Sequence, residues 1–408
     1  MADELRIGLT EQLRKAQMEG DADFLREGVR VLAQALMEIE VDQHVGAGRH
    51  ERTERRSGHR NGYRARSWDT RAGTVELSVP RVRDSSYFPS LLEPRRRTER
   101  ALSAVVVQEA YVHGVSTRKV DDLVKALGMT CISKSQVSRL CEELDEEVER
   151  FRGRPLEGPY PYVWLDATYV KARQDGRVAS TAVVIAVGEN GKSGEREVLG
   201  VDVGPSEVGA FWTSYLRSLV ARGLGGVRLV TSDAHRGLKG AIEAVLVGAS
   251  WQRCRVHFMR NALSLVPKAA QQMVGATIRT VFAQPDALSA REQWRRVADG
   301  FRSRFPRLSE LMEDAEEDVL SYASFPQEHW QKIWSNNPLE RVNKEIKRRT
   351  NVVGIFPTEG SVIRLVGSVL SEQHDEWQVS KRYFSAGSLA KLDRSEEQMA
   401  EQPQLVAS

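Results

Sequence analysis

The segment between residues 162 and 256 switches repeatedly between two hydrophobic periods, and this order restricts the fold more than any other feature. It begins with three consecutive apolar stretches that are typical of strands: Tyr162–Val170, Ser180–Val187 and Arg196–Val203. A helical pattern (Ser206–Arg222), a strand pattern (Val227–Ser232), a second helical pattern (Ala234–Val247) and a short strand pattern (Trp251–Val256) follow. Strands and helices in this order predict an α/β sheet that is covered by helices.

Three carboxylates occupy informative places in this pattern. Asp166 lies inside the apolar first strand, where an ionised carboxylate is costly unless donors surround it or it binds a metal. Asp233 directly follows the fourth strand, and ligands gather at the carboxyl ends of strands; its alternative role is to cap the next helix. Glu340 lies in the first turn of a late helix. It could instead cap that helix, with Asn337 as N-cap and Pro338 at the first helical position.

The order of strands and helices is that of a ribonuclease H-like fold, which brings these three positions to one edge of the sheet. We therefore predict a ribonuclease H-like α/β catalytic core with an all-α insertion, preceded by a mainly helical DNA-binding region. Asp166, Asp233 and Glu340 are the predicted catalytic and metal-binding residues. Three carboxylates at one edge can hold two Mg²⁺ (or Mn²⁺) ions about 3.5–4 Å apart for in-line displacement at a phosphodiester.

The helix that carries Glu340 has two distinct faces. Leu339, Val342 and Ile346 form its apolar stripe, and Glu340, Lys344 and Lys347 share the opposite side. A carboxylate followed by cations one and two turns later suits a site that handles phosphates, so Lys344 and Lys347 are predicted DNA contacts.

The region before residue 98 combines a helix with a basic stretch. Apolar residues recur at helical spacing from about Ala22 to Val41, and Thr74–Val82 alternates as a strand does. The net charge is only +3, but arginines concentrate between Arg49 and Arg71. Such blocks bind phosphate backbones, and the predicted DNA contacts here are Arg55, Arg56, Arg60 and Arg64. A solvated, flexible arm is the alternative.

Two helical patterns around residue 130 resemble a helix-turn-helix DNA reader. The first ends in an apolar stripe that Gly128 closes, and the second opens on Ser133, with Gln136 three residues later as in a capping box. Polar groups at the start of the second helix, Lys134, Gln136 and Arg139, are the predicted contacts with DNA. An ordinary helical hairpin remains the alternative.

Four motifs resemble those of Mutator-type bacterial insertion-sequence transposases, an Asp-Asp-Glu transposase family. They are Asp166-Ala-Thr-Tyr-Val-Lys171, Ser232-Asp-Ala-His-Arg-Gly-Leu238, Trp251-Gln-Arg-Cys-Arg-Val-His-Phe258 and Asn337-Pro-Leu-Glu-Arg-Val-Asn-Lys344. The likeness extends through Arg60-Asn-Gly-Tyr63, Val115-Ser-Thr-Arg-Lys119, Ser133-Lys-Ser135 and His374-Asp-Glu-Trp377, from about residue 20 to 384.

The resemblance implies a DNA transposase that binds terminal inverted repeats, cleaves the element ends and joins the 3′-hydroxyl strand to target DNA. It further implies a copy-out route through a circular intermediate. Double-stranded DNA is the expected partner, and paired ends imply a homodimer or higher assembly on DNA. A non-catalytic helix-turn-helix regulator (a domesticated transposase) is one alternative. A ribonuclease H-like nuclease that never joins strands is another.

The family's Cys-x-x-His element corresponds to Cys254 and His257. Two ligands do not make a zinc site, and packing around the fifth strand is the alternative. Trp251 is a candidate for stacking on a flipped base, against a simpler role in the core. Cys131, Cys141 and Cys254 are too few for a disulfide framework.

The expected location is the cytoplasm of a bacterium, in association with the nucleoid. The N-terminus has no apolar signal core, and no apolar run approaches the roughly 18 residues of a membrane span. The predicted division of the chain is 1–97 (N-terminal helix and Arg-rich region), 98–152 (helix-turn-helix), 161–257 (first part of the catalytic core), 258–334 (helical insertion), 335–384 (last core helices) and 385–408 (tail).

Overall fold

The computed structural model describes residues 22–48, 51, 56–70, 73–83, 87, 89, 92, 134–174, 176–204, 208–379 and 382–392. The chain divides into two compact units. The first comprises Met1–Arg96 together with Asp375–Lys381, and the second comprises Arg97–His374 together with Arg382–Ser408.

The second unit is built on one mixed sheet. Its strands are β3 (Tyr162–Gln174), β4 (Arg177–Glu189), β5 (Arg196–Gly204), β6 (Leu229–Ser232), β7 (Ser250–Arg253) and β8 (Ile355–Phe356). Their order is β5-β4-β3-β6-β7, and β8 pairs with β3. The first three strands are antiparallel neighbours, whereas β6 runs parallel to β3 and β7 parallel to β6. The prediction of an α/β fold is therefore confirmed.

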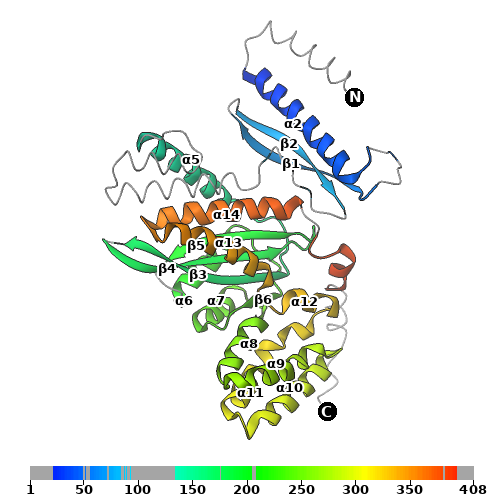
Figure 1. Ribbon diagram of the computed structural model, residues 1–408, viewed down its shortest axis with the longest axis vertical. Helices are drawn as coiled ribbons and strands as arrows, with labels where there is room; N and C mark the ends of the chain where they lie inside the picture. The colour runs from blue at the N-terminus through cyan, green and yellow to red at the C-terminus, as the bar shows by residue number, and fades with distance from the viewer. Residues whose placement is uncertain are drawn as a thin grey trace. The chain divides into compact units, whose positions relative to one another are not determined.

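Helices cover both faces of this sheet (Figure 1). On one face lie α6 (Gly209–Ala221) and α7 (Arg236–Val245), whose Trp212 and Ile242 share a buried core with Leu165 of β3. On the opposite face lie α5 (Lys134–Gly153), α13 (Asn337–Val353) and α14 (Glu359–Val379). Since successive side chains of a strand point to opposite faces, Asp166 is directed to the side of α13.

Between β7 and α13 the chain is helical, as the sequence predicts. The helices are α8 (Arg255–Ser264), α9 (Lys268–Arg279), α10 (Ala287–Arg302), α11 (Pro306–Val319) and α12 (Trp330–Ile333). Trp294, Val297 and Phe301 of α10 are buried along the predicted stripe. The strand prediction over Trp251–Val256 is too long, because α8 already begins at Arg255 after Cys254 takes the N-cap position.

The first unit consists of α2 (Ala22–Val45) and a hairpin of β1 (Arg60–Thr70) with β2 (Gly73–Val82). The helix and β2 confirm the predictions for Ala22–Val41 and Thr74–Val82. Leu77 and Val79 of β2 are buried against Met37 of α2. β1 is not apparent from the sequence, because the side chains that build the apolar core of this hairpin lie mainly on β2.

Several predictions fall outside the described residues: the first helix of the helix-turn-helix, Arg55 and the tail beyond residue 392. The second helix is present as α5, with Leu144 and Val148 buried. Part of the predicted tail (385–408) is packed, since Leu389 and Leu392 are buried. Within the described ranges, no helix is long and apolar enough to cross a bilayer.

Candidate active site

Asp166 is a half-buried carboxylate, and its hydrogen bonds within the described residues come from neutral donors. Its Oδ1 accepts a hydrogen bond from the backbone N–H of Ala167 (3.0 Å), and its Oδ2 accepts one from Nδ2 of Asn343 (2.6 Å). Burial raises the pKa of Asp166 to about 6, and repulsion from Asp233 adds to this rise. The positive charge of His257 and the two hydrogen bonds oppose it. A carboxylate kept at this cost inside a central strand indicates a functional site.

Asp233 lies at the carboxyl end of β6, next to the strand that carries Asp166. The two strands are in parallel register, with Trp164 opposite Thr231. Oδ1 of Asp233 accepts a hydrogen bond from the N–H of Ala234 (2.7 Å). The N-cap alternative for Asp233 is wrong, because α7 begins at Arg236 with His235 as its N-cap.

The start of α13 is fixed to the end of the sheet by Asn336. Its Nδ2 donates to the carbonyl of Leu165 (3.0 Å), and its backbone N–H donates to Sγ of Cys254 (3.3 Å). Asn336, not Asn337, is the N-cap, so the predicted helix start is one residue late. Asn336 makes no side-chain capping bond, and its amide group bonds β3 instead.

Glu340 is the fourth residue of α13 and shares a face with Asn336, four residues before it, and Asn343, three residues after it. Asn336 bonds Leu165 and Asn343 bonds Asp166, both on β3. Glu340 therefore lies on the face of α13 that packs against β3. Its side chain is half-buried and makes no hydrogen bond or ion pair with the described residues. The self-capping alternative for Glu340 is therefore wrong.

The rest of α13 matches the predicted division of its faces. Leu339, Val342 and Ile346 are buried, and Lys344 and Lys347 are exposed. Asn343 lies at the boundary between these faces. Its contact with Asp166 is not apparent from the sequence, because a polar residue at this position is normally exposed to solvent.

Asp166, Asp233 and His257 lie close enough that their charges interact: Asp233 and His257 shift the pKa of Asp166, and both aspartates shift the pKa of His257. In this part of the chain, no three Asp, Glu, His or Cys side chains are close enough to hold a metal ion. The donor chemistry nevertheless fits: carboxylate oxygens are the ligands that Mg²⁺ prefers, and Asp166 is half-buried with no ion pair among the described residues.

Cys254 and His257 pack where β7 meets α8. Cys254 is fully buried. A hydrogen bond with Cys254 raises the pKa of His257, burial lowers it, and the charges of Asp233 and Asp166 raise it further. Trp251 is half-buried: its indole N–H donates to Oγ of Ser232 (2.8 Å), and Nζ of Lys239 lies 4.6 Å from its ring centroid. These contacts favour a packing role for all three residues.

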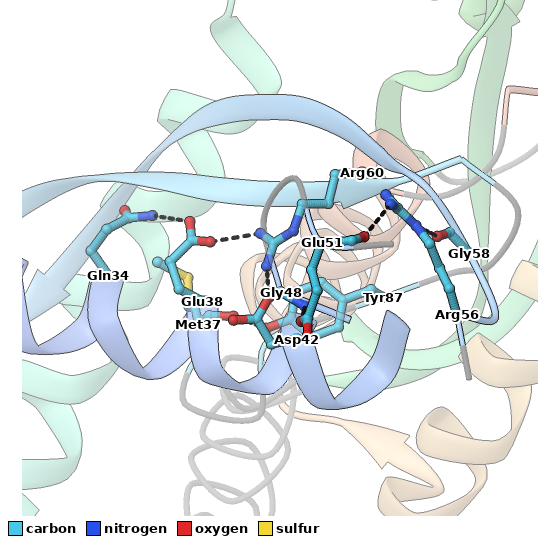
Figure 2. A network of polar contacts seen from close by, with 10 residues as sticks. All are labelled: Gln34, Met37, Glu38, Asp42, Gly48, Glu51, Arg56, Gly58, Arg60 and Tyr87. Atoms are coloured by element: carbon cyan, nitrogen blue, oxygen red, sulfur yellow. Dashed lines mark hydrogen bonds and ion pairs between the residues drawn. The ribbon is translucent and has the colours of Figure 1, made fainter. Parts of the chain in front are cut away.

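The arginines of the first unit make contacts within that unit. Arg60 forms ion pairs with Glu38 (2.6 Å) and Asp42, and Arg56 donates to the carbonyls of Gly58 and Glu51 (Figure 2). Arg64 donates to the carbonyl of Gln378 (3.2 Å). The alternative of a solvated arm therefore does not describe residues 56–70. On α5 of the second unit, Arg139 is exposed.

These features define an α/β protein with an acidic site at one edge of a mixed sheet. Residues 1–380 match the family model described as Transposase, Mutator family, and the chain belongs to this family. It is 49% identical over 378 residues to the transposase for insertion sequence element IS1081 of Mycobacterium tuberculosis, covering 92% of this chain and 91% of the relative.

Two further relatives are similar over most of their length. The transposase for insertion sequence element IS406 of Burkholderia multivorans is 40% identical over 373 residues (91% of this chain, 95% of the relative). The transposase for insertion sequence element IS256 in transposon Tn4001 of Staphylococcus aureus is 40% identical over 352 residues (86% and 90%).

Proposed function

We propose that this protein is an insertion-sequence transposase that binds terminal inverted repeats, cleaves the element ends and transfers the 3′-hydroxyl strand into target DNA. Asp166, Asp233 and Glu340 are the catalytic acids. The observation that carries the proposal is the position of Asp166. It is a half-buried carboxylate beside β6, the strand that directly precedes Asp233, and α13, which bears Glu340, is bonded directly to it through Asn343.

We also propose that the sheet is a ribonuclease H-like core. The strand order β5-β4-β3-β6-β7, with an antiparallel meander followed by two parallel strands, supports this assignment. The helices from α8 to α12 correspond to the predicted insertion at 258–334. The same proposal places the core in two parts, 161–257 and 335–384, around that insertion.

The three acids would hold Mg²⁺ or Mn²⁺, and two such ions would lower the pKa of water and stabilise the leaving oxygen of an in-line displacement. The chain's own residues prepare the site. Asn343 fixes the orientation of the Asp166 carboxylate, and Asn336 fixes the start of α13 against β3. The exposed Lys344 and Lys347 continue the face of Glu340 and are placed to bind backbone phosphates.

DNA is the proposed partner, and an active complex that holds two ends would contain at least two copies of the chain. Arg139 of α5 is a proposed DNA contact because it is exposed. The side chains of Lys134 and Gln136, at the start of the same helix, lie outside those that the structure describes, and both stay proposed DNA contacts. The internal contacts of Arg56, Arg60 and Arg64 leave these arginines less free to bind phosphates.

The test uses purified protein, Mg²⁺ and labelled DNA that carries the inverted repeats flanking the gene. The expected products are a nicked element end and, with target DNA, a joined strand. A nicked end without joining would instead indicate a simple nuclease. The genomic counterpart of this test is a short direct duplication next to each repeat.

A second candidate function is a DNA-binding regulator that does not cut. The absence of a three-ligand cluster among the described residues favours it. The same assay separates the two functions, because the regulator would bind the repeat and leave it intact with Mg²⁺ or Mn²⁺ present.

A further inference from the structure

Arg253 is the last residue of β7 and lies at the same edge of the sheet as the acids. In the parallel register of β6 and β7 it is opposite Ser232, the residue before Asp233. It is half-buried, and its guanidinium carbon lies 5.3 Å from the ring centroid of Phe258. Nε of Arg253 is buried without a hydrogen-bond partner, and among the described residues the side chain forms no ion pair.

Other cations near β7 have partners. Lys239 forms an ion pair with Asp318 (2.9 Å) and lies over the ring of Trp251. Arg255 lies over the rings of Phe282 and Trp334, at 4.6 and 4.1 Å from their centroids. Arg253 has the ring of Phe258 but no ion pair among the described residues, although a guanidinium remains charged in proteins and a half-buried charge without an ionic partner is costly. Burial lowers the pKa of Arg253, and the charges of Asp233 and Asp318 oppose this.

Two helices begin at this edge and add positive potential. α7 starts at Arg236, three residues after Asp233, and α8 starts at Arg255, two residues after Arg253. Neither His235 nor Cys254, the two N-caps, makes a side-chain capping bond. The N-terminal ends of helices attract anions, so the surroundings of Arg253 favour a phosphate although Asp233 is near.

We propose that Arg253 binds a backbone phosphate of the DNA strand that enters the acidic site, and holds that strand beside Asp233. This inference rests on the proposed function. An arginine can donate two parallel hydrogen bonds to the non-bridging oxygens of one phosphate, which fixes the position of the strand as well as its charge. The phosphate would supply the ionic partner that Arg253 lacks among the described residues.

The test is a double-mutant cycle between protein and DNA, read out as binding in buffer with EDTA. Single phosphates at and next to the cleaved end of a repeat duplex are replaced, one at a time, by neutral methylphosphonate. With the wild-type chain, one replacement should weaken binding about 10-fold or more, as expected for a charge-assisted hydrogen bond. Arg253→Gln should bind unmodified DNA more weakly by a similar factor. The same methylphosphonate replacement should then cause no further loss of affinity in Arg253→Gln.

The inference is overturned if every methylphosphonate penalty survives in Arg253→Gln. Arg253→Lys keeps the positive charge but not the paired donors, so the methylphosphonate should still weaken its DNA binding, but by less than in the wild type. This variant replaces Arg253→Gln in the test if Arg253→Gln does not fold. The matched control is Lys239→Gln with Asp318→Asn, which removes the neighbouring ion pair. This control should keep the penalty, and its loss would mean that the effect is structural and would also overturn the inference.

The cycle is measured without cleavage, so its outcome is separate from that of the proposed function. If the wild-type chain does not cut DNA but the penalty disappears in Arg253→Gln, only the proposed chemistry fails. If the chain cuts DNA and the penalty is unchanged, only the role of Arg253 fails.

Discussion

The side-chain amide of Asn343 donates a 2.6 Å hydrogen bond to the carboxylate of Asp166, which lies 177 residues earlier in the chain. One helix therefore does two things at this site: it carries Glu340 and it orients the acid of the central strand. The contact also ties the part of the chain after the helical insertion to the part before it. Asn336 adds a second bond from the same helix to β3, at Leu165.

The first prediction concerns Asn343 as a positioning residue. Asn343→Ala should slow cleavage by roughly 10- to 100-fold, the range found when a supporting partner of a metal-binding group is removed. DNA binding should not change, and the Mg²⁺ concentration for half-maximal cleavage should rise. Cleavage assays over a Mg²⁺ titration measure both effects.

Asn351 provides a matched control, because it is an exposed asparagine on the same helix. Asn351→Ala should cleave as the wild type does. If Asn343→Ala also cleaved normally over the whole titration, the hydrogen bond to Asp166 would have no role in the reaction.

The second prediction is that Asp166→Asn abolishes cleavage and keeps binding to the repeat. The amide is nearly the same shape and has one acceptor oxygen in place of the two that receive the hydrogen bonds of Ala167 and Asn343, but it cannot carry the negative charge. Gel-shift and nicking assays on one protein preparation measure the two properties. A loss of binding together with a loss of the folded state would show that Asp166 is structural.

The main sheet could be predicted from the sequence because each element carries its own local signal. Its long strands are apolar runs, and the helices between them have clear stripes. The acids Asp166 and Asp233 could be located for the same reason, since a charged residue inside or just after an apolar run is visible. β1 was missed because its partner β2 supplies the apolar residues of their shared core.

The contacts of the site could not be predicted in this way. Asn343 and Asn336 look like ordinary polar residues of a helix, and their importance comes from the tertiary packing of α13 on β3. The same is true of the basic residues before β2. A high density of arginines predicts phosphate binding, but Arg60 is held between Glu38 and Asp42 of α2. Local composition does not reveal such a partner.

The third prediction concerns pH and stability. Asp166 has its pKa raised from 3.8 to about 6 by burial, so folding favours its protonated form. Ionised Asp166 therefore lowers the stability of the folded state. This destabilisation is absent below the unfolded pKa of 3.8, grows as pH rises from 3.8 to about 6 and is complete above about 6. At about 1.4 kcal/mol per pKa unit, this cost is on the order of 3 kcal/mol.

Asp166→Asn removes that cost. In buffer with EDTA, the variant should therefore melt several degrees above the wild type at pH 8, and the difference should vanish near pH 4. Thermal unfolding of both proteins across this range measures the effect. Equal melting temperatures of Asp166→Asn and the wild type at pH 8 would show that ionised Asp166 does not destabilise the fold.

The fourth prediction separates stability from DNA binding in the arginine-rich stretch. Arg60 is largely buried between two carboxylates, so Arg60→Met leaves Glu38 and Asp42 without their cation and should destabilise the first unit. Limited proteolysis should cut residues 56–83 faster in this variant.

Arg139→Ala is the comparison, since that side chain is exposed. It should weaken DNA binding and reduce its dependence on salt, with no change in proteolysis or melting temperature. If Arg60→Met resisted protease as the wild type does and still lost DNA binding, Arg60 would be a direct contact.

The fifth prediction compares two glutamates on α13. Glu340 has no partner among the described residues, whereas Glu345 accepts hydrogen bonds from Arg348 (2.8 Å) and Arg349 (3.0 Å). The bond from Arg348 is the main cause that lowers the pKa of Glu345 to about 2. Glu345 thus stabilises the fold above its unfolded pKa of 4.5, and this contribution is lost as pH falls toward 2.

The two substitutions should therefore have opposite consequences. Glu340→Gln should leave the melting temperature unchanged at pH 8 and abolish cleavage, because Glu340 has no hydrogen bond or ion pair to lose among the described residues and is the proposed third catalytic acid. Glu345→Gln should lower the melting temperature slightly and leave cleavage intact. Cleavage by Glu340→Gln at the wild-type rate would remove Glu340 from the catalytic acids, and the third carboxylate would then have to come from elsewhere in the chain.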